Sequence, residues 1–244
     1  MTVSIIIPTL NEARSLPATL ERLKHLDPEP LDVIVVDSGS QDDTVTIAKQ
    51  YGAHVIEDAP RGRAVQMNLG AKQASGDRLC FLHADTELPN DFVDLAEQVF
   101  ADPRTALAGF ISVMRGPSGV RRVTTAHNFI KTWYAPLFFR PFSFFRGCRL
   151  LFGDQVMVCR SADFEAIGGW STELAIMEEA DLCLRMVRQG RGRVRQVARK
   201  VWSSDRRVAE WGFWRANLTF IYIGLMWGFG APSERLARHY EDVR

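Results

Sequence analysis

The sequence predicts an α/β fold in which a mostly parallel sheet is flanked by helices and followed by a helical C-terminal appendage. Continuous apolar runs at Val3–Ile7, Val33–Val36 and Leu79–His83 have the length and composition of strands that are buried on both faces. Segments with helical spacing separate these runs, and polar turns follow them. Alternation of this kind implies right-handed βαβ crossovers and a parallel sheet.

The first hundred residues contain four units of strand, loop and helix. In order, we expect a strand at Val3–Ile7, a helix with Leu16, Leu20 and Leu23 on one face, a strand at Val33–Val36, a helix ending at Gln50, a short strand at Val55–Ile56, a loop and helix at Arg61–Ala74, a strand at Leu79–His83 and a helix at Pro89–Phe100. Carboxyl ends of parallel strands meet at one edge, where ligands bind. We therefore expect Glu12, Asp37 and Asp85 to line that edge.

The second half is less regular. In order, we expect a strand at Thr105–Met114, a helix at Arg121–Tyr134, a strand at Val156–Cys159, a short helix at Arg160–Trp170, a helix that buries Leu182, Met186 and Val187, and an apolar helix within Trp211–Ala231. The uninterrupted apolar run at Leu218–Ala231 is shorter than the roughly 20 residues that span a bilayer. This helix therefore packs on the domain, at an oligomer interface or in a membrane surface.

An aromatic run and a basic run of the sequence each allow two interpretations. The aromatic run Phe138–Phe145 forms either a contact patch for a ligand, partner or membrane, or part of the core under the sheet. The basic run Arg185–Arg207 is either a solvated face or a surface that attracts lipid headgroups or an anionic acceptor.

Composition limits the class of protein. The chain has 244 residues, which suits one large domain or one domain with an appendage. Its formal net charge of +1 argues against a nucleic-acid binder, which normally has a strong basic excess. The four cysteines form no Cys-x-x-Cys pair, so we expect reduced packing residues in a cytoplasmic protein. The first residues lack the pattern of a signal peptide, and export is not expected.

Asp85 ends the fourth predicted strand at the mouth of the crevice. A carboxylate there suits Mg²⁺ or Mn²⁺, which take one or two protein carboxylates and complete their coordination with water and phosphate oxygens. The alternative is that Asp85 or Thr86 caps the following helix. The turn from Pro8 to Glu12 contains no glycine, so the dinucleotide-binding fingerprint is absent and a dehydrogenase is disfavoured.

Four blocks of the first hundred residues resemble family 2 glycosyltransferases, which have the Rossmann-like GT-A fold. The blocks are Ile-Ile-Ile-Pro-Thr-Leu-Asn-Glu (5–12), Val-Val-Asp-Ser-Gly-Ser-Gln-Asp-Asp-Thr (35–44), Arg-Gly-Arg-Ala-Val-Gln-Met-Asn-Leu-Gly-Ala (61–71) and Phe-Leu-His-Ala-Asp-Thr (81–86). The C-terminal tail and the His-Ala-Asp block also resemble the bacterial subgroup called selenodomain-associated transferase 2, which is linked by name to arsenosugar biosynthesis.

In that family, the edge of the first half binds a nucleoside-diphosphate sugar together with Mg²⁺ or Mn²⁺. The resemblance places Pro8 and Glu12 in the nucleoside pocket. It also assigns Asp37 to a contact with the base of the nucleotide.

The run His83-Ala84-Asp85 occupies the position of the family's Asp-x-Asp motif, which implies that Asp85 is the metal carboxylate. The departure is His83, where the family more often has an aspartate; its imidazole either faces the ribose or metal or is only hydrogen-bonded. Arg63, and less favourably Arg61, is a candidate for the diphosphate, because guanidinium groups bind phosphates in a bidentate manner. The alternative is a solvated loop arginine.

The acceptor side of the family resembles two stretches of the second half. Asp154 and Gln155 become candidate acceptor contacts, and Glu179 falls at the position of the general base, with Glu178 as the second candidate. An acceptor hydroxyl needs a carboxylate to take its proton, and the departing diphosphate needs a cation to stabilise its charge. The acids Glu178 and Glu179 would alternatively serve only to complement a helix dipole.

The resulting prediction is a glycosyltransferase that moves a sugar from a nucleoside diphosphate to a hydroxyl acceptor, lipid-linked or anionic, with inversion. Residues 1–200 would form the GT-A domain, with a nucleotide-sugar half at 1–104 and an acceptor half at 105–200. Residues 201–244 would form a C-terminal helical segment. Peripheral contact with the inner face of the membrane and a homo-oligomer are left open.

Two alternatives compete with this prediction. A nucleotidyltransferase also uses a sheet-edge metal carboxylate, but it usually has a glycine-rich basic loop after the first strand, which Pro8–Glu12 lacks. A catalytically inactive nucleotide-sugar-binding or membrane-surface protein is the second alternative, because His83 and Glu179 depart from the family pattern.

Overall fold

The computed structural model describes residues 2–117 and 119–240 of the chain. The strands are β1 (Val3–Thr9), β2 (Asp32–Asp37), β3 (His54–Ile56), β4 (Arg78–Phe81), β5 (Thr86–Glu87), β6 (Thr105–Gly116), β7 (Gly119–Val120), β8 (Met157–Arg160) and β9 (Arg193–Ser204). The helices are α1 (Leu16–Leu23), α2 (Thr44–Gln50), α3 (Arg63–Gln73), α4 (Phe92–Phe100), α5 (Arg122–Phe139), α6 (Pro141–Phe145), the 3-10 helix η1 (Gly153–Gln155), α7 (Ser161–Ala166), α8 (Glu178–Arg188), α9 (Arg206–Trp211), α10 (Phe213–Gly228) and α11 (Ser233–Ala237).

All the strands of the described chain belong to one sheet, in the order β3-β2-β1-β4-β8-β6-β9-β5, with β7 beside β6. Strands β1 to β4, β6 and β9 run in one direction, while β5, β7 and β8 run in the opposite direction. The sheet is therefore mostly parallel, as the sequence predicts. The α/β class with a helical C-terminal part is also confirmed.

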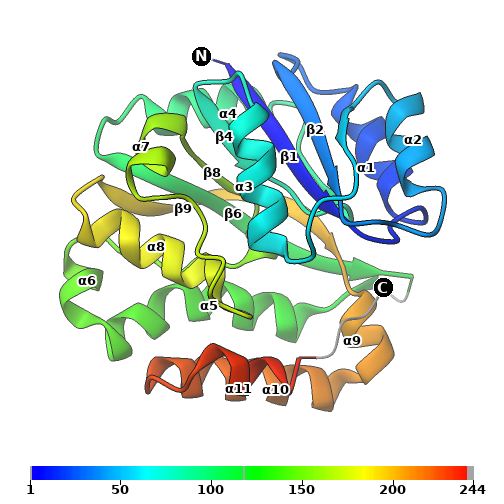
Figure 1. Cartoon of the computed structure of the whole chain (residues 1–244). Coiled ribbons are helices and arrows are strands. Elements are labelled where there is room, and N and C mark those ends of the chain that lie inside the picture. Colours follow the sequence, from blue (N-terminus) through cyan, green and yellow to red (C-terminus); the bar gives the residue numbers. More distant parts are fainter. Residues whose placement is uncertain (1, 118, 241–244) are drawn as a thin grey trace.

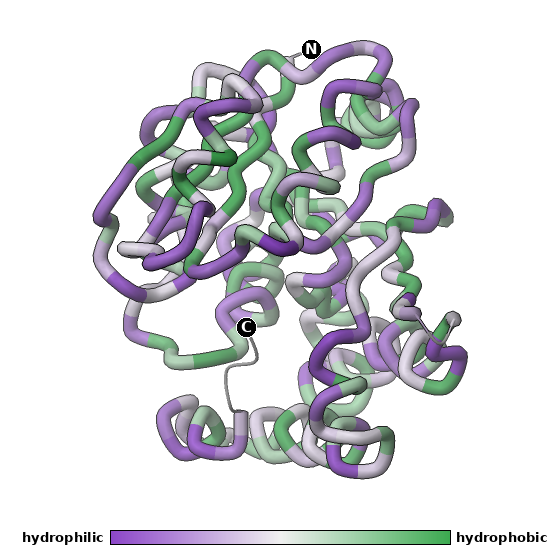
Figure 2. Tube along the Cα trace, turned by 90° about the vertical axis from the view of Figure 1, so that its right-hand side faces the viewer, coloured by the Kyte–Doolittle hydropathy of each residue, from purple (hydrophilic) through white to green (hydrophobic). Residues whose placement is uncertain are grey.

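Alternate side chains of β1 enter two different cores, because successive residues of a strand point to opposite faces. Ile6 packs in a cluster with α3 residue Met67 and with buried residues of α7 and α8. Ile5 and Ile7 pack in a second cluster with α1, α2 and α4, which contribute Leu20 and Phe92 among others. Both faces of the sheet are thus covered by helices (Figure 1). Hydrophobic (green) and hydrophilic (purple) stretches alternate along the chain trace (Figure 2).

Helices α5 and α10 lie side by side beneath the sheet and run in the same direction (Figure 1). Near their starts, Thr124 Oγ1 donates a hydrogen bond of 3.0 Å to Asn217 Oδ1. Near their ends, the rings of Phe139 and Phe229 contact each other with centroids 5.2 Å apart. Within the described residues, we find no helix whose length and apolar character would let it cross a membrane.

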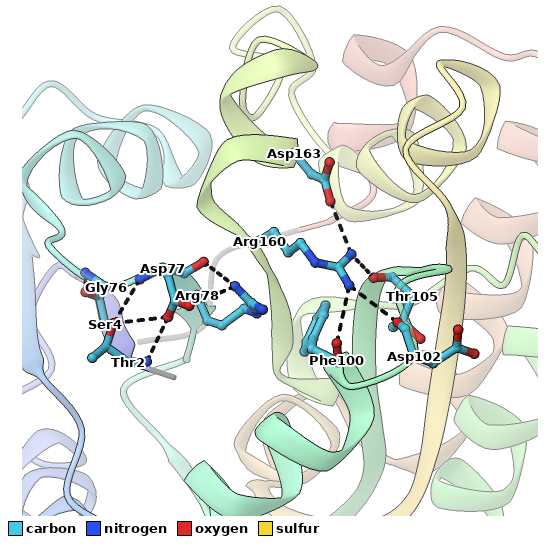
Figure 3. Close-up of polar contacts among 10 residues, drawn as sticks. All are labelled: Thr2, Ser4, Gly76, Asp77, Arg78, Phe100, Asp102, Thr105, Arg160 and Asp163. Carbon is cyan, nitrogen blue, oxygen red and sulfur yellow. Dashed lines mark hydrogen bonds and ion pairs between the residues drawn. The ribbon is translucent and has the colours of Figure 1, made fainter.

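A polar cluster fixes the edge of the sheet opposite the strand ends that carry Asp85 (Figure 3). Arg160, at the end of β8, donates hydrogen bonds to the backbone oxygens of Thr105, Phe100 and Asp102. At the start of β4, Asp77 Oδ1 accepts a hydrogen bond of 2.7 Å from the backbone N–H of Thr2. These contacts hold the starts of the strands, and they leave the other edge for a ligand.

The second half differs from the prediction in two elements. The basic run contains a twelve-residue strand, β9, because its backbone pairs with β6 along most of its length while Val194 and Val201 turn into the core. The predicted boundary between residues 200 and 201 therefore falls inside a strand. The expected apolar helix within Trp211–Ala231 is confirmed as α10, and Gly212, with a φ of 80°, separates it from the short helix α9. The expected short helix at Arg160–Trp170 ends at Ala166.

The aromatic run is helical and is divided between solvent and interior. It forms the end of α5 and all of α6. Phe138, Phe142 and Phe145 are 74%, 86% and 80% exposed, whereas Phe139 packs on Phe229. The run therefore contributes a surface patch more than it contributes core.

Candidate functional site

A cavity of about 750 Å³ opens at the carboxyl end of the first strands. The loops after β1 and β4 form one wall, and the start of α3 forms another. Helices α5, α8 and α10, with the segment around Arg206, complete it. Of the predicted site residues, those that line the cavity are Pro8, Glu12, Arg63, His83, Ala84, Asp85, Asp154, Glu178 and Glu179. Most of the predicted constellation is thus brought together.

The side of the cavity where the nucleotide sugar is predicted to bind contains two carboxylates and one arginine. Asp85 follows β4, and its carboxylate is largely buried, with Oδ2 3.4 Å from the guanidinium of Arg206. The same guanidinium binds Glu12 through two contacts of 3.0 and 2.9 Å. Burial raises the pKa of Asp85, and the positive charge of Arg206 opposes that rise. Arg206 thus neutralises a pair of acids that would otherwise repel each other.

Asp37 lies behind this wall and is not among the residues that line the cavity. Its Oδ1 accepts hydrogen bonds of 3.0 and 2.8 Å from the backbone N–H groups of Gly39 and Ser40. Its Oδ2 accepts bonds from the hydroxyls of Ser40 and Thr9. A contact between Asp37 and a nucleotide base stays a prediction, and it would require some of these hydrogen bonds to break.

The two glutamates at the start of α8 are held by Arg63 from the start of α3. Arg63 Nη1 lies 3.3 Å from Glu179 Oε1, and its Nε lies 3.5 Å from Glu178 Oε1. The same Nη1 is 3.4 Å from His83 Nε2. Residues that are far apart in the sequence therefore form one cluster, in which Arg63 contacts both candidate bases and His83.

The protonation states of this cluster follow from its burial. Burial raises the pKa of Glu179 to about 7, the charge of Glu178 adds to the rise, and the guanidinium of Arg63 opposes it. Burial lowers the pKa of His83 to about 3, and the charge of Arg63 adds to the fall. His83 is therefore a neutral imidazole, while Glu179 changes charge near neutral pH, as a general base should.

Glycine at position 153 allows His83 and Glu179 to approach each other. A Cβ atom there would lie 2.5 Å from His83 Nε2 and 2.7 Å from Glu179 Oε1. The backbone on both sides of the cluster is also strained, because Val156 and Met177 have φ values of 53° and 69°. Such strain costs roughly 1–3 kcal/mol per residue and tends to occur at functional sites.

The two residues predicted to contact the acceptor lie in different surroundings. Asp154 lines the cavity, and its Oδ2 accepts a hydrogen bond of 2.7 Å from Asn128 Nδ2 on α5. Gln155 is fully buried outside the cavity lining, where it bonds to Thr132 and to the backbone N–H of Phe152. Gln155 therefore joins η1 to α5 and does not face an acceptor directly.

Helix α5 adds cavity residues that the sequence did not single out. The ammonium of Lys131 lies 3.8 Å from the ring centre of Phe152. Burial lowers the pKa of Lys131, and the charges of Asp154 and Glu179 oppose the change. His127, one turn away, contacts the hydroxyl of Tyr134 at 3.2 Å, and burial lowers its pKa to about 4. No motif identifies these residues, and only their helical spacing of three and four places them on one face.

Arg206 was predicted only as one member of a basic run. The order of elements contains a signal, because Asp205 and Arg206 follow directly after a strand, β9, that runs parallel to β6. Recognition of β9 would have placed Arg206 at the edge where ligands bind. The alternation of Val and Arg residues in β9 is interrupted, so the sequence shows the period-two pattern of a strand only weakly.

The donor set around Asp85 fits a hard divalent cation. Within residues 2–117 and 119–240, no group of three His, Cys, Asp or Glu side chains could hold a metal by itself. Mg²⁺ needs no such group, because it usually takes one or two carboxylates and completes its octahedron with water and substrate phosphates. The guanidinium of Arg206 already contacts Asp85 at 3.4 Å, so a cation that binds there would share or displace this contact.

Comparison with known proteins gives a consistent result. The sequence pattern of "Glycosyl transferase family 2" matches residues 4–164. An uncharacterized glycosyltransferase of Rickettsia felis is 37% identical over 99 residues, which are 41% of this chain and 34% of that protein. The pre-mycofactocin glycosyltransferase of Mycobacterium tuberculosis is 26% identical over 200 residues, which are 77% of this chain and 39% of that protein. The chain thus spans a little over a third of the length of these relatives.

Solved structures share the fold. A mannosyltransferase from Pyrobaculum calidifontis, in complex with GDP-Man and Mn²⁺, has a TM-score of 0.67 and 19% identity, covering 99% of this chain and 65% of that one. Glucosyl-3-phosphoglycerate synthase from Mycobacterium tuberculosis, in complex with Mg²⁺ and UDP, has a TM-score of 0.60 and 19% identity, covering 95% and 80%. At these identities the likeness concerns the fold alone.

Proposed function

The chain belongs to glycosyl transferase family 2, and from this premise we propose that it transfers a sugar from a nucleoside diphosphate to a hydroxyl acceptor with inversion. The observation that carries the proposal is the position of Glu179, a buried carboxylate with a pKa raised to about 7, in the same cavity as Asp85. Family membership also removes the support for a nucleotidyltransferase.

The proposed reaction uses the two sides of the cavity differently. Glu179 takes the proton of the acceptor hydroxyl while the oxygen attacks the anomeric carbon. The bond from that carbon to the diphosphate breaks on the opposite face, which inverts the configuration. Arg63 holds Glu179 in place and limits the rise of its pKa. We assign Glu179 as the base and keep Glu178 as the second candidate.

The donor side would hold the nucleoside diphosphate and a divalent cation. Asp85 would bind Mg²⁺ or Mn²⁺, which supplies positive charge to the departing diphosphate. Pro8, Glu12 and Ala84 line the same cavity. Support for metal use comes from the fold neighbours that contain Mn²⁺ or Mg²⁺. The subgroup linked by name to arsenosugar biosynthesis stays a proposal that the His83-Ala84-Asp85 block supports.

Exchange of each glutamate for glutamine tests the assignment of the base. Glutamine keeps the shape of the side chain but cannot take a proton, so Glu179→Gln should lower kcat by about 10²- to 10⁴-fold, the usual contribution of general base catalysis. Glu178→Gln is the matched control and should keep most of the activity. The measurement is the rate of sugar transfer from each member of a panel of nucleotide sugars. Binding of the nucleotide sugar is measured separately.

The opposite ranking of the two variants would show that Glu178 is the base. Unchanged turnover in both variants would contradict the mechanism. Donor binding without turnover in the wild type, across a broad set of hydroxyl acceptors, would favour the inactive binding protein.

A further inference from the structure

The six most exposed large hydrophobic side chains of the described residues all come from three helices or their ends. They are Phe138, Phe142, Phe145, Trp214, Leu218 and Phe229, with exposed fractions from 61% to 86%. We call this set the aromatic face. Scattered single exposed apolar residues are normal, but concentration on neighbouring elements indicates a binding surface.

The elements that carry the aromatic face are adjacent in space. Helices α5 and α10 end together, where Phe139 contacts Phe229 and Arg140 Nη1 donates a hydrogen bond of 2.9 Å to the oxygen of Gly228. Helix α6 follows directly after α5 at this corner (Figure 1). The face therefore includes one corner of the molecule and continues along α10, which is about 24 Å long at 1.5 Å per residue.

Helix α10 is apolar on two sides. Its inner side contributes Phe220, Ile223 and Trp227 to the wall of the cavity. Its outer side presents Trp214 and Leu218 to solvent, so the part of a helix that is normally polar is apolar here. A helix of this kind needs an apolar environment on its outer side as well.

The charged residues within the segments that form the aromatic face have one sign. Residues 103–153 contain no Asp or Glu, and neither do residues 211–233. The exposed cations Arg122, Arg146 and Arg215 lie on or beside α5, α6 and α10. Aromatic side chains with Arg and no acidic residue match the interface of an anionic bilayer, which combines an apolar interior with negative headgroups.

We propose that the aromatic face binds the surface of an anionic lipid bilayer, with α10 lying along the interface. Phe138, Phe142 and Phe145 enter the boundary between headgroups and acyl chains, and the arginines contact the phosphates. This inference goes beyond the proposed function, and it does not depend on it. Where this inference and the proposed function both hold, only helix α10 separates the cavity from the lipid, and a membrane-anchored hydroxyl acceptor is within reach.

The test is flotation of the full chain with vesicles of phosphatidylcholine alone and of phosphatidylcholine mixed with phosphatidylglycerol. The wild type should float with the anionic vesicles at low salt, less so at high salt, and weakly with the neutral ones. The triple variant Phe138→Ser, Phe142→Ser, Phe145→Ser should reduce the bound fraction at least about tenfold, because these rings supply the apolar contact. Arg146→Glu should weaken binding to the anionic vesicles only.

Leu31→Ser is the matched control, because Leu31 is 50% exposed but belongs to the loop before β2. It should leave flotation unchanged, and Glu179→Gln should do the same, so a failure of the transfer mechanism would be seen separately. Circular dichroism checks that each variant is folded.

Two results would overturn the proposal. One is a wild type that stays in the soluble fraction with both kinds of vesicle. The other is a wild type that is dimeric by light scattering, does not float, and becomes monomeric in the variant Trp214→Ser, Leu218→Ser. That outcome would make the aromatic face an interface between copies of the chain.

Discussion

Single residues of the site gain their chemistry from their surroundings. A glutamate in water has a pKa near 4.5, and burial beside Glu178 raises the pKa of Glu179 to about 7. The guanidinium of Arg63, 3.3 Å away, prevents a further rise. A carboxylate with this pKa holds its proton weakly enough to be deprotonated near neutral pH and strongly enough to accept one from a hydroxyl.

The first prediction at this scale concerns pH. As the proposed base, Glu179 would have to be deprotonated to act, so kcat/KM should rise with pH around a midpoint of about 7. Arg63→Met removes the charge that opposes the rise of the pKa, so its midpoint should lie at higher pH. The measurement is the pH profile of both proteins. An unchanged midpoint in Arg63→Met would show that Glu179 does not control the profile.

The raised pKa of Glu179 also makes the stability of the fold depend on pH. The folded state keeps the proton of Glu179 up to about pH 7, whereas an unfolded glutamate releases it near 4.5. The folded state therefore binds more protons between these values, and the contribution of this group to stability falls as the pH rises through that window.

The elements of the first half are fixed by close packing between helix and sheet. Helix α3 crosses β1 and β2 so closely that only glycine fits at position 70. A Cβ atom there would lie 2.4 Å from Ile6 Cγ2 and 3.1 Å from Val36 Cγ2. The arrangement places the start of α3, and with it Arg63, at the edge of the cavity.

Exchange of two helix glycines for alanine tests this packing. Gly70→Ala should destabilise the protein by about 1–3 kcal/mol, since the added methyl group overpacks the core. Gly224→Ala is the matched control in α10, where no atom beyond the neighbouring residues and backbone of its own helix lies within 4 Å of the new Cβ. It should stabilise the protein by about 0.5–1 kcal/mol, the usual gain for alanine in a helix. Urea unfolding measures both, and equal midpoints for the two variants would contradict the packing argument.

At the scale of the whole molecule, the cavity joins parts that are distant in the sequence. Arg206 reaches Glu12 across 194 residues, and α5 and α10 close the side opposite the sheet. A ligand that binds here contacts both halves of the chain. Binding should therefore raise the stability of the molecule as a whole.

A thermal-shift panel measures that effect. UDP, GDP and their sugars, each with and without Mn²⁺, should include one that raises the melting temperature. A ligand at 100 times its Kd adds about 2.7 kcal/mol of stability. The metal-dependent part of the shift should be lost in Asp85→Asn and kept in Asp94→Asn, a matched exchange on the exposed side of α4. A full metal-dependent shift in Asp85→Asn would remove Asp85 as the metal carboxylate.

The sequence by itself determined the first half of the fold and the edge where Asp85 and Glu12 lie. Strands such as Val3–Thr9 are local apolar runs, so composition and period identify them without knowledge of their neighbours. The rule that carboxyl ends of parallel strands share one edge then brings distant acids together. Glu179 needed the family resemblance as well, because its motif alone also describes an ordinary helix start.

Only the tertiary structure decided the rest. Strand β9 exists because β6 pairs with it, and its arginine-rich pattern does not require a strand. The position of Arg206 and the burial of Gln155 depend on how that strand and α5 pack. The pKa of Glu179 and the exposure of the aromatic face depend on which side chains are removed from water. Local composition does not contain that information, because solvation is a property of the assembled chain.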